Sequence, residues 1–143
     1  MSARGLRLIG RLGLEKIRSM GWSPEAVGGL TMGADPVAYA IARASLDDGP
    51  AVDAFSVRKE AKGHGTARRV EGNFREGARV VVVEDVLTSG GSACKAVEAV
   101  REAGGTVLGV LAVVDREAGG AAALGDLGVE AVALVTARGL GLG

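Results

Sequence analysis

Cysteine and histidine are almost missing from this sequence, which contains only Cys94 and His64. A single cysteine excludes a framework of internal disulfide bonds. With neither a second cysteine nor a cluster of histidines, the usual ligand sets for zinc are also excluded. This cysteine usage fits a reducing compartment, so we expect a cytoplasmic protein.

The sequence has no excess charge of either sign and no long apolar run at its start. Seventeen basic residues balance seventeen acidic ones, so no field of the whole molecule favours nucleic acid or an anionic membrane as a partner. The first 17 residues, MSARGLRLIGRLGLEKI, are interrupted by Arg7, Arg11, Glu15 and Lys16. They lack the apolar core of a signal peptide and the length of a membrane span, so we expect a soluble protein.

The sequence does contain alternating helical and strand patterns. Apolar residues at roughly helical spacing predict a helix over residues 1–20, and Asp35 and Pro36 suit the N-cap and first position of a second helix. Further helices are expected at 95–105 and 117–128, and strands at 26–29, 52–57, from 79 onward, 106–114 and 129–135. Continuous apolar strands between helices predict one α/β domain over residues 1–143, with a mainly parallel sheet covered on both faces.

The stretch VVVVEDVLTSGGSA, residues 80–93, carries the clearest chemical pattern. Small residues from Thr88 to Ser92 precede a predicted helix, so backbone N–H groups and the helix N-terminus can together bind an anion. Gly90 and Gly91 permit backbone conformations that other residues avoid and let a phosphate approach closely. We interpret this loop as a phosphate-binding site.

Glu84 and Asp85 come directly before that loop, at the expected end of the strand. As ionised carboxylates they accept hydrogen bonds only, which suits the two adjacent hydroxyl groups of a ribose. Alternatively, the acids merely cap a turn and the glycines merely shape it. The acids, hydroxyls and glycines occur in one order at one strand–helix junction, which favours a phosphosugar site.

These residues resemble the phosphoribosyl pyrophosphate (PRPP) signature of type I phosphoribosyltransferases, and the similarity covers nearly the whole chain. VRKEAKGHG, from Val57, is similar to the catalytic loop of the orotate phosphoribosyltransferases, and VVDREAGG, from Val113, to their orotate-binding segment. GGLTMGADP, from Gly28, is similar to the first loop that faces pyrophosphate. The resemblance implies a Rossmann-like fold and transfer of a phosphoribosyl group from PRPP to orotate, in pyrimidine (UMP) biosynthesis.

The resemblance also assigns residue roles. It implies Lys62, His64 and Asp85 as catalytic residues, and Thr88 and Arg116 as residues that bind orotate. It implies that Mg²⁺ is held mainly by PRPP and water and not by protein ligands. The residues that it implies for PRPP binding are Arg58, Lys59, Lys62, His64, Glu84, Asp85, Val86, Leu87, Thr88, Ser89, Gly90, Gly91 and Ser92.

The reaction itself requires cations. Displacement of pyrophosphate from C1 of ribose passes through a transition state of oxocarbenium character, while negative charge collects on the leaving group. Arg58, Lys59 and Lys62 can stabilise that charge, and His64 can donate a hydrogen bond or a proton to it. Alternatively, these residues form a solvated basic loop. His64 is flanked by Gly63 and Gly65, and this favours a loop that closes over substrate.

The sequence departs from the family pattern at two places. Gly33 stands where many members have a lysine that contacts pyrophosphate. Members usually begin with a segment that forms a hood over the base, and this sequence begins after it, so we expect weak binding of orotate. A phosphoribosyltransferase for another base and a noncatalytic PRPP-binding module stay as alternatives. The resemblance further implies a homodimer in which Lys62 and His64 act in the partner's active site.

Overall fold

The computed structural model describes residues 1–60 and 69–141, and its centre is a six-stranded sheet. The strand order is β3-β2-β1-β4-β5-β6, and every neighbouring pair is parallel except β2 and β3. The strands are β1 (Ala26–Leu30), β2 (Asp53–Val57), β3 (Val70–Gly72), β4 (Arg79–Leu87), β5 (Thr106–Asp115) and β6 (Ala131–Thr136). The predicted α/β class and the mainly parallel sheet are confirmed.

Strand β3 is the one strand of the described chain that the sequence did not predict. It pairs antiparallel with β2 through the partners Phe55 and Gly72, Ser56 and Glu71, and Val57 and Val70. Only Val70 of its three residues is buried, so no apolar alternation marks it in the sequence. This strand therefore forms through its hydrogen bonds with β2 and not through a pattern of its own sequence.

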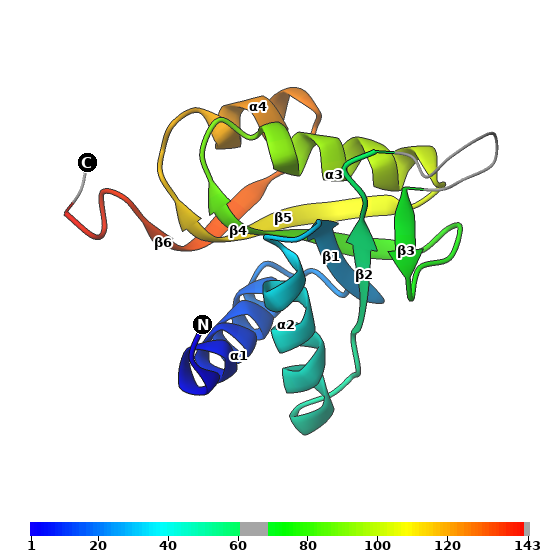
Figure 1. Ribbon diagram of the computed structural model, residues 1–143, viewed down its shortest axis with the longest axis horizontal. Coiled ribbons are helices and arrows are strands. Elements are labelled where there is room, and N and C mark those ends of the chain that lie inside the picture. The colour runs from blue at the N-terminus through cyan, green and yellow to red at the C-terminus, as the bar shows by residue number, and fades with distance from the viewer. Residues whose placement is uncertain (61–68, 142–143) are drawn as a thin grey trace.

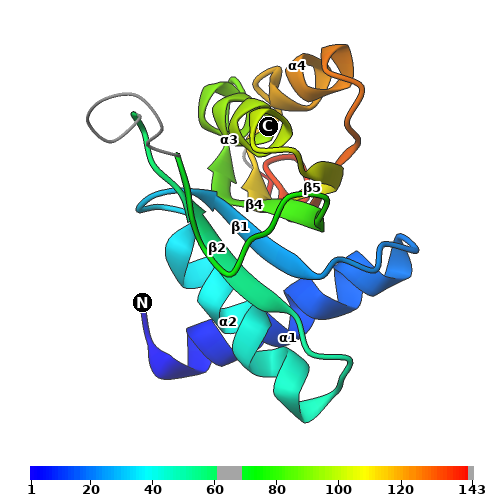
Figure 2. The same ribbon diagram turned by 90° about the vertical axis from the view of Figure 1, so that its right-hand side faces the viewer.

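Two layers of helices cover the two faces of the sheet, as predicted (Figures 1 and 2). Helices α1 (Ala3–Ser19) and α2 (Asp35–Asp47) pack on one face, around Ile17, Val37 and Ile41. Helices α3 (Gly91–Glu102) and α4 (Gly120–Asp126) pack on the other face. Val80 and Val82 of β4 belong to the core on the α3 side, and Val81 and Val83 to the core on the α1 side. Strand β4 is therefore buried on both faces, as its run of valines predicts.

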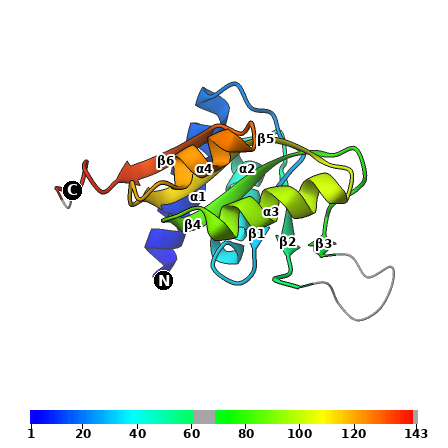
Figure 3. The same cartoon turned by 90° about the horizontal axis from the view of Figure 1, so that it is seen from above.

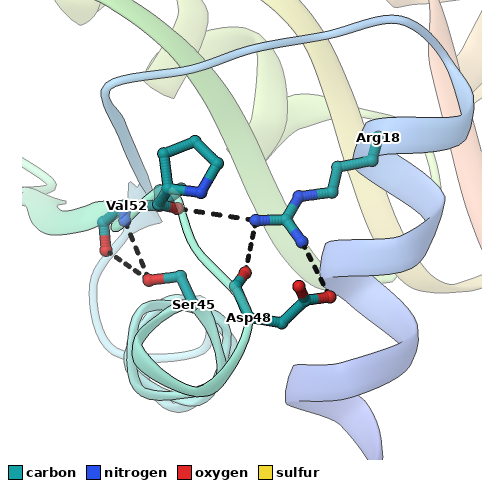
Figure 4. Close-up of polar contacts among 5 residues, drawn as sticks. Arg18, Ser45, Asp48 and Val52 are labelled. Atoms are coloured by element: carbon teal, nitrogen blue, oxygen red, sulfur yellow. Dashed lines mark hydrogen bonds and ion pairs between the residues drawn. The ribbon is translucent and has the colours of Figure 1, made fainter.

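A polar network fixes the connection between α2 and β2 to helix α1 (Figure 4). The guanidinium of Arg18 donates to the carboxylate of Asp48 at 3.1 Å and to its carbonyl oxygen at 2.6 Å. The buried hydroxyl of Ser45 donates to the carbonyl of Ala42 and accepts the N–H of Val52 at 2.8 Å. These contacts hold the residues that lead into β2 in place and so position the start of that strand.

The five parallel strands all end at the same edge of the sheet (Figure 3). Four connections gather at this edge: residues 31–34 after β1, 58–60 after β2, 88–90 after β4 and 116–119 after β5. Ligands of open α/β sheets bind at this edge.

Within residues 1–60 and 69–141, no helix is both long enough and apolar enough to cross a membrane.

Candidate active site

The phosphate loop predicted from the sequence lies between β4 and α3. Gly90 is the N-cap residue of α3 and adopts a left-handed conformation, with φ 94° and ψ 2°, and no side chain caps the helix. The first hydrogen bond of the helix runs from the N–H of Cys94 to the carbonyl of Gly90 at 2.8 Å. The N–H groups that precede it are those that an anion can accept at a helix N-terminus.

The first residues of helix α4 pack against this loop. A methyl group on Gly90 would lie 3.1 Å from the Cα atom of Gly120 and 3.3 Å from Cβ of Ala123. A methyl group on Gly120 would lie 2.7 Å from the carbonyl oxygen of Thr88. The loop and the start of α4 thus fit together without room for side chains, while Thr88, Ser89 and Ser92 are exposed to solvent.

The two acids before the loop lie in different environments. Glu84 is 6% exposed, whereas Asp85 is exposed to solvent. Burial raises the pKa of Glu84 to about 8, and the hydrogen bond and negative charge of Asp85 contribute to the same shift. We expected two ionised carboxylates, and the burial of Glu84 favours the protonated form of this residue. Asp85 is thus the acid whose side chain is exposed at the end of β4.

The raised pKa of Glu84 makes stability depend on pH. Because the folded state binds this proton more tightly than the unfolded state does, the contribution of Glu84 to stability is fully present below the usual glutamate pKa of about 4.5 and is lost as the pH rises through about 8. We expect Glu84→Gln, which cannot lose a proton, to flatten this fall and to exceed the wild type in stability at pH 8. Urea unfolding at pH 5, 6.5 and 8 measures the free energy of unfolding of both proteins. An equal change of this free energy with pH in the wild type and in Glu84→Gln would contradict the prediction.

The first loop reaches the acid pair from β1. A methyl group on Gly33 would lie 3.2 Å from both carboxylate oxygens of Asp85, so the loop backbone contacts that side chain closely. The peptide bond between Thr31 and Met32 is cis. The sequence predicted Asp35 as the N-cap of α2, and this is wrong, because Ala34 occupies that position. The Asp35 carboxylate instead accepts hydrogen bonds from Thr31 and Ser56.

The end of β2 carries the first two basic residues of the predicted catalytic loop. The guanidinium of Arg58 pairs with Glu71 on β3 at 2.9 Å, and Lys59 is exposed. Arg69, which the sequence did not single out, donates to the carbonyl oxygens of Arg58 and Lys59, both at 3.1 Å. Lys62 and His64 lie outside the described residues, so their roles stay predictions.

Arg116 lies at the end of β5, next to the phosphate loop. Its N–H donates to the carbonyl of Leu87 at 2.9 Å, which brings it beside Thr88, the other residue expected to bind orotate. A cavity of about 420 Å³ adjoins it, lined by Arg116, Glu117, Ala137, Arg138 and Gly141. Glu117 has φ 58°, and its carboxylate accepts the N–H of Arg138 at 2.8 Å. Sequence reasoning missed Arg138, since it comes from another strand end.

The structure therefore brings most of the predicted PRPP-binding residues to one edge. Asp85, Thr88, Ser89, Gly91 and Ser92 are exposed there, whereas Leu87 is 2% exposed and offers a ligand only its backbone. In the described part of the chain, no group of three or more His, Cys, Asp or Glu side chains is placed to hold a metal ion.

The fold and the glycine-rich loop at the β4–α3 junction define a class of α/β proteins with a mainly parallel sheet, and the comparison with known families gives the family. Residues 2–125 match the model of the phosphoribosyl transferase domain. The orotate phosphoribosyltransferase of Rhodopirellula baltica is 48% identical over 97% of this chain, which covers 74% of that protein. That of Aquifex aeolicus is 56% identical over 79% of this chain, and the matched segment is 61% of its length. The chain belongs to the orotate phosphoribosyltransferase family.

Solved structures give the same result. The orotate phosphoribosyltransferase of Mycobacterium tuberculosis in complex with PRPP is 44% identical, with a TM-score of 0.85 over 99% of this chain and 78% of its own. The adenine phosphoribosyltransferase of Leishmania tarentolae, at 20% identity and a TM-score of 0.71, shares the fold. The predicted type I phosphoribosyltransferase fold is confirmed.

Proposed function

We propose that this chain transfers the phosphoribosyl group of PRPP to orotate, giving orotidine 5′-monophosphate and pyrophosphate. The observation that carries the proposal is that the first loop, at Gly33, lies against the Asp85 carboxylate just before the loop that Gly90 ends at the start of α3. A 5′-phosphate bound at the start of α3 would have its ribose at Asp85 and its pyrophosphate at the first loop. Arg116, on the other side of Thr88, can pair with the carboxylate of orotate through two parallel hydrogen bonds.

In the proposed reaction, different residues of this edge have different roles. The Asp85 carboxylate orients the ribose hydroxyls as C1 acquires positive charge, and backbone N–H groups of the loop keep the 5′-phosphate in place. The negative charge of the departing pyrophosphate is stabilised by Lys59, Lys62 and His64. The family resemblance supports this role for Lys62 and His64. Mg²⁺, bound mainly by PRPP oxygens and water, would neutralise part of that charge.

The family resemblance also supports a cytoplasmic homodimer in which Lys62 and His64 complete the partner's site. Closed two-fold dimers are the commonest symmetric assemblies of soluble proteins. Analytical ultracentrifugation at two concentrations measures the assembly, and a single species of 14.3 kDa at both would exclude this arrangement.

We expect the purified chain to consume orotate only when PRPP and Mg²⁺ are present. The loss of orotate absorbance follows the reaction, with uracil, adenine and hypoxanthine as matched bases. Consumption of one of those bases in place of orotate would support a transferase of different specificity. Calorimetric binding of PRPP without turnover of any base would support a noncatalytic binding module instead.

A further inference from the structure

Asp35 links the two connections that flank the expected pyrophosphate position. The hydroxyl of Thr31, just after β1, donates to one carboxylate oxygen of Asp35 at 2.6 Å. The hydroxyl of Ser56, near the end of β2, donates to the other at 3.0 Å. All three side chains are half-buried, which strengthens such hydrogen bonds relative to exposed ones.

Backbone hydrogen bonds make this link part of one unit. The N–H of Thr31 donates to the carbonyl of Val57 at 2.8 Å, and the N–H of Asp35 donates to the carbonyl of Met32 at 3.2 Å. Arg58 follows Val57 directly, while Gly33 lies against the carboxylate of Asp85. The Asp35 carboxylate thus bridges the segment that faces Asp85 and the segment that carries Arg58 and Lys59.

From this geometry we infer that Asp35 is a positioning residue for pyrophosphate: it holds the loop at 31–34 and the end of β2 in the arrangement that receives the diphosphate of PRPP. It does so through Thr31 and Ser56, without itself contacting substrate. A loop that is ordered before binding loses less conformational entropy when the ligand arrives. The role rests on the proposed function, because it assumes that pyrophosphate lies between these two segments.

The network separates the two halves of PRPP. The 5′-phosphate loop belongs to β4 and α3, whereas the Asp35 carboxylate accepts from Thr31 and Ser56 and its N–H donates to Met32. Loss of the Asp35 carboxylate should therefore weaken binding of diphosphate and leave binding of ribose 5-phosphate unchanged. A general loss of stability would weaken both ligands alike.

The test measures binding of magnesium pyrophosphate and of ribose 5-phosphate by calorimetry. We expect Asp35→Ala to weaken pyrophosphate binding roughly tenfold, and Thr31→Val and Ser56→Ala to weaken it about threefold each. Asp35→Asn retains a carbonyl acceptor and should recover part of the loss. Ribose 5-phosphate should bind all variants within about twofold of the wild type, a margin below the effect of one hydrogen bond.

Asp47→Ala is the matched control, because Asp47 lies on the same helix but forms an exposed ion pair with Arg43 at 3.1 Å. It should bind both ligands as the wild type does. Equal weakening of both ligands in Asp35→Ala and Ser56→Ala, or unchanged pyrophosphate binding in both, would overturn the inference. If the wild type binds ribose 5-phosphate but neither pyrophosphate nor PRPP, the proposed function fails, and the inference fails with it.

Discussion

Asp85→Asn is expected to lower both PRPP affinity and turnover on the order of 100-fold, about the effect of one lost hydrogen bond to a charged group. Glu84 is buried and its pKa is raised, so Asp85 supplies the exposed acidic side chain at the end of β4. The amide of asparagine keeps the shape but loses the charge and one acceptor. The N–H of Val86, which donates to Asp85 at 2.7 Å, can still donate to the amide oxygen.

The stability of Asp85→Asn should stay within about 0.5 kcal/mol of the wild type, because the side chain is exposed. Asp53→Asn makes the same chemical change at the start of β2, at the opposite edge of the sheet, and should leave binding and turnover unchanged. Calorimetry with PRPP and steady-state kinetics measure the two effects. PRPP affinity equal to that of the wild type would remove Asp85 from the proposed site.

Gly29→Ala is expected to have the largest effect on folding, a loss of about 3 kcal/mol in the free energy of unfolding. A Cβ atom on Gly29 would lie under 3.0 Å from the carbonyl oxygen of Val83 on β4 and from Cβ of Ala34. A backbone atom of the sheet cannot move aside as a flexible side chain can. The sheet must then open between β1 and β4, its two central strands.

Thermal unfolding measures this loss, which corresponds to a decrease in the melting temperature of roughly 10 °C for a domain of this size. Gly125→Ala is the control, because a Cβ atom there would meet nothing within 4 Å and φ at Gly125 is not positive. Alanine also favours helix over glycine, so this variant should be neutral or slightly more stable. Equal stability of the two variants would show that β1 has room for a side chain at Gly29.

The position of the phosphate loop could be predicted from the sequence because its signals are local. A run of valines predicts a buried strand, glycines predict the turn, and the apolar period after them predicts the helix. These residues are consecutive in the chain, so no distant contact is needed to bring them together. The loop from Thr88 to Ser92 lies where it was expected, and Gly90 takes the left-handed conformation that glycine permits.

Properties that depend on neighbours far along the chain could not be predicted in this way. Asp35 looks like a helix cap beside Pro36, yet its partners are Thr31 and Ser56, the latter 21 residues away. Arg116 and Arg138 share a cavity only because β5 and β6 are adjacent in the sheet. Sequence spacing carries no information about either arrangement.

The sequence by itself determined the alternation of helices and strands, the α/β class and the order of acids, hydroxyls and glycines at the β4–α3 junction, because these follow from periodicity and short-range backbone preferences. Only the tertiary structure decided that Glu84 is buried and has a raised pKa while Asp85 is exposed, and that Gly33 lies against Asp85. The physical reason is burial. Adjacent residues of a strand point to opposite sides, and the packing of the other elements determines which of them loses its water.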